Sequence, residues 1–219
     1  MGSGYKPDLN YNMTLPNQLT VLRIILTPIF AFALFKQGFN WKFIAVLIFI
    51  VASLTDFYDG IIARKYGYVS QWGKFLDPLA DKILVSTAMV SLAMLGYIQM
   101  WMVIVIIFRD VVITILRSYA MFRKQSIRTM KIAKWKTAVQ DAVVYFVLLF
   151  MLVEEHFLTA GTDAPLVNFI RNFQFIEIFM WIATILTVFT GVKYLVDNKE
   201  HTKSLLQEFI HVFASSDVG

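Results

Sequence analysis

Long, nearly uninterrupted apolar segments limit the folds open to this chain more than any other feature of its sequence. About 20 apolar residues cross the hydrocarbon core of a bilayer as a helix, and backbone groups in lipid have to be paired within the span. Of the residues, 58% are hydrophobic and 16% are charged, whereas a soluble domain carries about 25% charged residues. We therefore predict an all-α, polytopic membrane protein with six transmembrane helices plus short interfacial helices. The predicted spans cover residues 19–35, 43–63, 79–97, 101–122, 138–153 and 175–196.

The chain is predicted to form one membrane domain, residues 14–197, between two terminal segments. Residues 1–13 are an N-terminal leader that begins with the tag-like stretch Met-Gly-Ser-Gly. Residues 198–219 are a cytoplasmic tail, and its first part, 198–213, has the apolar spacing of an interfacial helix. The connections after the second and fourth spans carry most of the basic loop residues. Basic loops stay on the cytoplasmic side of a membrane, so both termini are expected there as well.

Composition excludes several kinds of site. The chain has no cysteine, which rules out disulfides, thiol catalysis and thiolate metal ligands. Its three histidines are scattered and form no ligand cluster. The net charge is +5, but the basic residues flank apolar spans instead of forming one soluble face. We therefore expect membrane lipid or a phosphate, and no nucleic acid, as the partner.

Four aspartates stand at the predicted cytoplasmic ends of the second and third spans, and they are Asp56, Asp59, Asp77 and Asp81. Residues three or four apart share one face of a helix, so two helices direct all four carboxylates to one place. Any one of them alone would be an ordinary helix-end carboxylate. Together they repel one another, and each costs about 2.5–3.5 kcal/mol at mid-membrane and less near the interface. Bound cations offset that cost, and aspartate oxygens suit Mg²⁺ or Mn²⁺.

Three further residues lie on the same face of the second span. Gly60 and Ala63 leave room for a flat or bulky ligand, although small residues also let two membrane helices pack closely. Arg64 has a fork of donors that fits a phosphate, although a basic residue here is also a common membrane-surface anchor. These three residues alone do not decide between the alternatives.

The aspartates and their neighbours form the pattern D-x-x-D-G-x-x-A-R, then eight residues, then G-x-x-x-D-x-x-x-D. This pattern resembles the signature of the CDP-alcohol phosphatidyltransferases. Eight positions match it without a gap, and they are Asp56, Asp59, Gly60, Ala63, Arg64, Gly73, Asp77 and Asp81. The resemblance also covers the six-span plan, and it implies a homodimer with a polar cavity that opens to the cytoplasm.

By this resemblance, the four aspartates hold two divalent cations, Mg²⁺ or Mn²⁺, and Asp81 is also the general base. Paired cations neutralise a diphosphate and orient an in-line attack on it. CDP-diacylglycerol is the implied phosphatidyl donor, and CMP is the leaving group. The residues expected to bind the donor are Gly60, Ala63, Arg64, Gly73, Asn17 and Thr20.

The fourth predicted span contains a second polar group, formed by Arg109, Asp110, Thr114 and Arg117. The last three share one stripe of the helix, and Arg109 lies beside it. Charged residues inside a span usually face a cavity or a partner. One alternative is a self-neutralising pair of Asp110 and Arg117, which leaves Arg109 unpaired and available to an anionic ligand.

Two lysines lie at the start of the fifth span. Lys134 shares a stripe with Thr137 and Asp141 and is expected to face the cavity. Lys136 points to nearly the opposite side and is expected to be a membrane-surface anchor. The predicted ligands of a phosphate on the acceptor are Arg109, Arg117 and Lys134.

This region is similar to that of bacterial phosphatidylglycerophosphate synthases, with Asp110 in place of the usual glutamate and Ala133 in place of a glycine. The resemblance implies transfer to glycerol 3-phosphate, which yields phosphatidylglycerophosphate and CMP, in a bacterial inner membrane with the site facing the cytoplasm. Inositol phosphate, a neutral polyol, serine and phosphatidylglycerol are alternative acceptors.

Two other functional classes stay open. One is a divalent-cation transporter that uses the carboxylates as its pathway. Against it, the acids cluster at one membrane face and no matching acidic pair occurs in the second half of the chain. The other is an inactive, lipid-binding relative, which the intact eight-position motif disfavours.

Overall fold

The computed structural model describes residues 15–66, 71–122, 131–161 and 165–199, with side chains for 20–55, 82–117, 135–161 and 165–199. Its helices are α1 (Leu15–Phe35), α2 (Phe39–Tyr66), α3 (Gln71–Met94), α4 (Met100–Phe122), α5 (Lys131–Ala160), α6 (Pro165–Asn172) and α7 (Phe175–Asp197). No strand occurs in this part of the chain. The predicted all-α class is confirmed for these residues.

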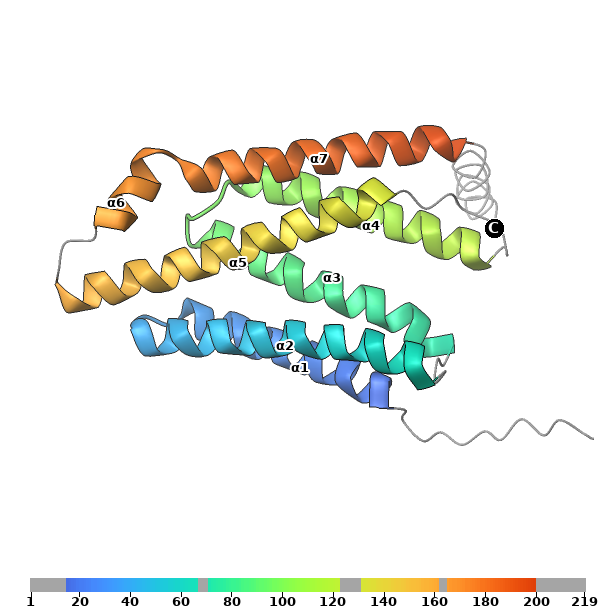
Figure 1. The fold of residues 1–219 in the computed structure, drawn as a ribbon, viewed down its shortest axis with the longest axis horizontal. Coiled ribbons are helices and arrows are strands. Elements are labelled where there is room, and N and C mark those ends of the chain that lie inside the picture. The colour runs from blue at the N-terminus through green and yellow to red at the C-terminus, as the bar shows by residue number, and fades with distance from the viewer. Residues whose placement is uncertain (1–14, 67–70, 123–130, 162–164, 200–219) are drawn as a thin grey trace, which may run out of the picture.

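Six long helices lie side by side along one axis, and the chain runs back and forth between the two ends of the bundle (Figure 1). α1 and α2 pack as a pair, α3 contacts both of them and also α4 and α5, and α7 contacts α4 and α5. The short helix α6 contacts α5 and α7. The carboxyl ends of α2, α4 and α7 therefore lie at the same end of the bundle as the amino ends of α1, α3 and α5. We call this end, which holds residues 56–64 and 73–81, the motif end.

Two reversals at the other end, from α1 to α2 and from α3 to α4, are short because two glycines adopt left-handed backbone conformations. Gly38, between α1 and α2, has φ 98°, and Gly96, between α3 and α4, has φ 82°. The N–H groups of Gly96 and Tyr97 donate to the carbonyls of Ala93 and Leu92, each at 3.0 Å. These are the two hydrogen bonds of a Schellman motif. Since glycine reaches positive φ without strain, they end α3 and turn the chain into α4.

The core is apolar and draws on all six long helices. Its fully buried side chains include Phe30 of α1, Phe49 of α2, Met89 of α3, Met102 of α4 and Met151 of α5. The ring centroids of Phe30 and Phe49 are 5.4 Å apart. Between helices that lie in lipid, such side chains stabilise the bundle by close van der Waals packing. This core holds the helices together, and the charged groups lie toward its ends.

Large apolar side chains also cover the outside of the bundle, which is unusual for a protein surrounded by water. Phe108 of α4 is 70% exposed and Trp135 of α5 is 73% exposed. Among the described residues, two stretches are long and apolar enough to cross a membrane, Trp135–Ala160 and Phe175–Asp197. These observations support a membrane protein, while the number of six spans stays a prediction.

Each predicted span falls on a long helix of its own. The ranges agree with α1, α2, α4, α5 and α7, but the range 79–97 runs past the end of α3 at Met94. The apolar run continues beyond Met94, and only the hydrogen bonds at Gly96 show where the helix stops. The short helix α6 lies outside all predicted spans. The interfacial helix predicted for 198–213 falls beyond the described residues, apart from its first two.

Candidate active site

The eight-position motif occupies two helices, α2 and α3, that contact each other. α2 carries Asp56, Asp59, Gly60, Ala63 and Arg64, and α3 carries Gly73, Asp77 and Asp81. Both stretches are helical, as the prediction of shared faces requires. The side chains of all eight residues lie outside the described part of the structure. Among the side chains that are described, no group of three acidic or histidine residues could hold a metal ion. The aspartate metal site therefore stays a prediction.

The first turns of α1 lie beside the start of the motif. Asn17 is in the first turn, with its side chain outside the described residues, and Thr20 is buried one turn later. Arg23 is fully buried, and its Nε donates a hydrogen bond to the carbonyl oxygen of Ala52 at 3.3 Å. Ala52 lies one turn before Asp56 on α2. The predicted donor-binding residues of α1 are thus at the same end of the bundle as the aspartates.

Four charged side chains from α3, α4 and α5 form what we call the Asp110 cluster, which consists of Lys82, Arg109, Asp110 and Lys136. The carboxylate of Asp110 is buried, and its Oδ1 accepts hydrogen bonds from Lys136 Nζ at 2.5 Å and Arg109 Nη1 at 3.2 Å. Lys82 Nζ donates to Oδ2 at 3.4 Å. Three positive charges and one negative charge leave this cluster with a net charge of +2.

The Asp110 cluster adjoins the motif. Lys82 directly follows Asp81, the last motif position, and its ammonium group reaches Asp110 on α4. Surplus positive charge in a partly buried place is costly by itself, and a bound anion would offset that cost. Charge-assisted hydrogen bonds from arginine and lysine are the usual way in which proteins hold phosphates. The arrangement therefore suits a phosphate group next to the motif.

The prediction that Lys136 anchors α5 at the membrane surface is wrong. Its side chain is 2% exposed and pairs with Asp110. The buried face of α5 runs through Lys136, Gln140 and Val144. Thr137 lies on the stripe that was predicted to face the cavity, but it is only partly buried. The periodicity of one helix shows which residues share a face. It does not show which of those faces meets a neighbouring helix with the opposite charge.

The alternative pair of Asp110 and Arg117 is not formed among the described side chains. Asp110 pairs with the three cations of its cluster, and Arg117 is exposed two turns further along α4. Arg109 is not left unpaired either, because it donates to both Asp110 and Thr190. Arg117 lies toward the motif end of α4, and Lys134 lies in the first turn of α5 at the same end. The side chain of Lys134 is outside the described part of the chain, so its role stays a prediction.

Lys82 and Thr190 are residues of this region that the sequence analysis does not single out. Lys82 could have been found as a charged residue inside a predicted span, which is rarely without a function. Thr190 belongs to a row with Thr184 and Thr187 on α7, at helical spacing in an otherwise apolar segment. All three are buried. Such a polar row indicates a face that meets protein instead of lipid.

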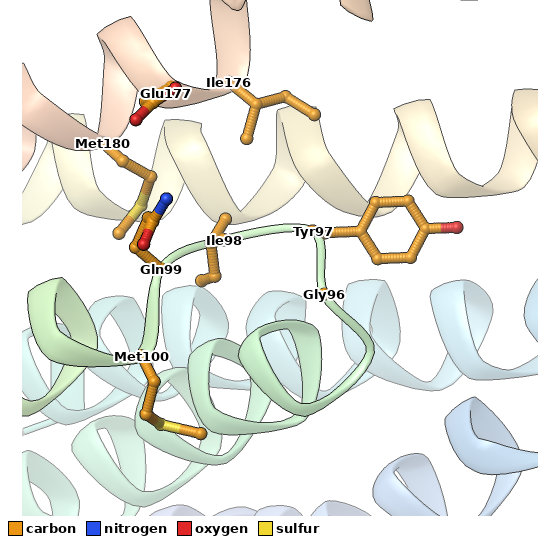
Figure 2. Close-up of a pocket in the computed structure, with 8 residues that line it drawn as sticks. All are labelled: Gly96, Tyr97, Ile98, Gln99, Met100, Ile176, Glu177 and Met180. Carbon is orange, nitrogen blue, oxygen red and sulfur yellow. The ribbon is translucent and has the colours of Figure 1, made fainter.

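A pocket of about 370 Å³ lies at the other end of the bundle, between the α3–α4 turn and the start of α7. Its lining residues are Gly96, Tyr97, Ile98, Gln99, Met100, Ile176, Glu177 and Met180. Figure 2 shows Glu177 and Met180 of α7 facing Gln99 across it. α3 has 24 residues, a length of about 36 Å, with the motif near its start and this pocket past its end. It is therefore not the cavity predicted at the aspartates.

Comparison with known families shows where this arrangement belongs. A family model described as CDP-alcohol phosphatidyltransferase matches residues 13–189, a range that includes every predicted site residue. The chain belongs to the CDP-alcohol phosphatidyltransferase family. Of the classes that the sequence leaves open, this membership selects the transferase over the cation transporter.

Curated relatives of this phosphatidyltransferase come from several bacteria. The chain is 35% identical over 203 residues to the CDP-diacylglycerol–glycerol-3-phosphate 3-phosphatidyltransferase of Bacillus subtilis. This alignment covers 87% of this chain and 97% of the relative. It is 30% identical over 193 residues to the protein of the same name from Rickettsia felis, and that alignment covers 88% of this chain and 99% of the relative. The similarity therefore extends far beyond the aspartate motif.

Proposed function

We propose that this phosphatidyltransferase moves the phosphatidyl group of CDP-diacylglycerol to glycerol 3-phosphate, forming phosphatidylglycerophosphate and CMP in bacterial phospholipid synthesis. The Asp110 cluster is the observation that carries the choice of acceptor. Its surplus positive charge lies beside the motif, and it suits a substrate that brings its own phosphate. The names of the relatives from Bacillus subtilis and Rickettsia felis agree with this acceptor.

The proposed metal ligands are Asp56, Asp59, Asp77 and Asp81, and the proposed ions are two divalent cations, Mg²⁺ or Mn²⁺. The residues fit such ions for two reasons. Carboxylate oxygens are the hard donors that these cations prefer, and the two helices that carry them contact each other. When bound, the ions neutralise the diphosphate of the donor and orient an in-line attack.

Asp81 is the proposed general base. It takes the proton of the acceptor hydroxyl, and the hydroxyl oxygen attacks the phosphorus on the lipid side of the diphosphate. The bond from that phosphorus to the bridging oxygen breaks, and CMP leaves. An aspartate is suited to this role because a positioned carboxylate removes the proton as the new bond forms. The proposed contacts to the donor are Gly60, Ala63, Arg64, Gly73, Asn17 and Thr20.

The phosphate of the acceptor is proposed to bind at the Asp110 cluster. Its proposed ligands are Arg109, Arg117 and Lys134. Lys82 and Lys136, which both pair with Asp110, contribute two more positive charges to the same region. Each hydrogen bond from a charged donor contributes about 1.5–3 kcal/mol. An acceptor without a phosphate does not form these hydrogen bonds, so the cluster favours a charged acceptor over a neutral one.

We further propose that α1 to α5 and α7 are the six membrane spans, in a bacterial inner membrane with the motif end in the cytoplasm. The basic connections after the second and fourth spans support this orientation, because both belong to the motif end. The large exposed side chains on α4 and α5 fit lipid as their surroundings. A homodimer is proposed from the resemblance to the family.

A CMP-release assay tests the proposed function. In mixed micelles of detergent and CDP-diacylglycerol, we expect release that requires both glycerol 3-phosphate and Mg²⁺ or Mn²⁺. Glycerol should lower kcat/KM by roughly 100-fold or more, because at least two charge-assisted hydrogen bonds of about 1.5–3 kcal/mol each are lost. CMP is measured by chromatography over time.

The acceptor panel includes serine, inositol phosphate and phosphatidylglycerol, and protein treated with EDTA is the control without metal. Faster release with one of these acceptors than with glycerol 3-phosphate would assign the enzyme to that acceptor and leave the chemistry intact. If no acceptor gives CMP, the enzyme assignment fails and the inactive relative takes its place.

A further inference from the structure

We propose that Thr190 and Gly191 of α7 are positioning residues that hold the Arg109 guanidinium for the phosphate of the acceptor. This inference rests on the proposed function, and it concerns residues beyond the part of the chain that the family model matches, which ends at residue 189. It adds a fourth helix to the charged region built by α3, α4 and α5.

Gly191 provides the space that the Arg109 side chain occupies. A Cβ atom placed on Gly191 would lie 2.9 Å from Cγ of Arg109 and 3.2 Å from its Nε. Carbon atoms do not approach that closely without one of them moving. The aliphatic part of Arg109 therefore lies directly against the backbone of α7, and any larger residue at position 191 displaces it.

Thr190 fixes the outer end of the same side chain. Its Oγ1 accepts a hydrogen bond from Arg109 Nη2 at 3.0 Å. The same oxygen lies 2.7 Å from the carbonyl oxygen of Leu186 and 3.1 Å from that of Thr187, so the hydroxyl proton is directed along α7. Because the hydroxyl proton of Thr190 is used within α7, the lone pairs of its oxygen point away from the helix and can accept a hydrogen bond. The hydroxyl is thus oriented to receive the guanidinium.

The hydrogen bonds of Arg109 to Asp110 and Thr190 do not use all of its N–H donors. A guanidinium has five N–H donors. Asp110 receives one through Nη1 and Thr190 receives one through Nη2. Among the described residues, no group accepts a hydrogen bond from the buried Nε of Arg109. Leaving this buried donor without a partner is costly, and an oxygen of a bound anion is a group that would accept its hydrogen bond.

A simpler explanation is that small residues of α7 only let membrane helices pack closely. The atoms nearest to the position of a Cβ on Gly191 are all from the Arg109 side chain and not from another backbone. Thr190 also makes a direct hydrogen bond to that side chain. The two residues therefore act on the arginine, and replacing them is expected to affect the binding of the acceptor first.

Thr190→Val and Gly191→Ala test the proposal in the CMP-release assay. Thr190→Val removes the hydroxyl at constant shape, and Gly191→Ala pushes the arginine aside. Each should raise the KM for glycerol 3-phosphate roughly tenfold, which corresponds to about 1.4 kcal/mol. The KM for CDP-diacylglycerol and the rate with glycerol as acceptor should stay unchanged. Thr190→Ser keeps the hydroxyl and should restore the KM of the wild type.

Thr184→Val is the matched control. Thr184 is buried on the same row of α7, and its hydroxyl also donates to the carbonyl four residues earlier, but among the described side chains it makes no hydrogen bond to Arg109. It should keep the KM of the wild type for both substrates. If the wild type is active while Thr190→Val and Gly191→Ala keep their KM for glycerol 3-phosphate within twofold, the positioning role is overturned. An equal rise in both KM values would also overturn it. Failure of the proposed function would differ, because the wild type itself would then release no CMP.

Discussion

Replacing Asp81 by asparagine should reduce the rate of CMP release by about 10²–10⁴-fold, the range over which general acid–base groups contribute to catalysis. Asparagine keeps the size of the side chain and one oxygen, but it does not accept the proton of the acceptor hydroxyl. Asp56, Asp59 and Asp77 remain in this variant, so it should still bind the nucleotide. Single-turnover CMP release measures the chemical step, and calorimetry with CDP measures binding.

Asp197→Asn is a suitable control for Asp81→Asn. Asp197 is an exposed acid at the last position of α7 and is not part of the eight-position motif, so the change removes the same charge from a residue with no proposed role. This control should turn over like the wild type. Normal turnover of Asp81→Asn would exclude Asp81 as the base. Loss of turnover together with loss of CDP binding would instead assign Asp81 to holding the metal ions alone.

Asp110→Asn should lower the free energy of unfolding by about 3–5 kcal/mol, because removing one partner of a buried ion pair leaves an uncompensated charge. Here the carboxylate has three cationic partners, and the side chain of Lys136 is 2% exposed. The amide accepts a hydrogen bond but does not neutralise any of these charges. Unfolding in one detergent, followed by circular dichroism, compares the variant with the wild type and with Asp197→Asn.

A second substitution separates charge from shape at this site. Lys136→Met removes one buried positive charge and keeps much of the side-chain volume. In the Asp110→Asn background it should restore part of the lost stability, so the double variant should be more stable than the sum of the single effects predicts. Strictly additive effects would contradict the charge balance inferred for the Asp110 cluster. A single Asp110→Asn variant as stable as the wild type would contradict it as well.

The sequence by itself was sufficient to place the long helices and the motif. Apolar runs of about 20 residues are a requirement of the bilayer, so their positions are visible without any neighbour. The helical spacing of Asp56, Asp59, Asp77 and Asp81 depends on local periodicity alone, and both stretches are helical in the structure. The predicted end of α3 was less accurate, because an apolar run carries no information about the hydrogen bonds at Gly96 that stop the helix.

The partners of the buried charges could be known only from the packing of the helices. Asp110 meets Lys82, which is 28 residues away, and Lys136, which is 26 residues away. Arg109 meets Thr190 at a separation of 81 residues. Periodicity within one helix orders its own faces, but the rotation of that helix against its neighbours follows from the burial of the whole core. That rotation brings Lys136 inside the bundle and places Arg109 across Gly191.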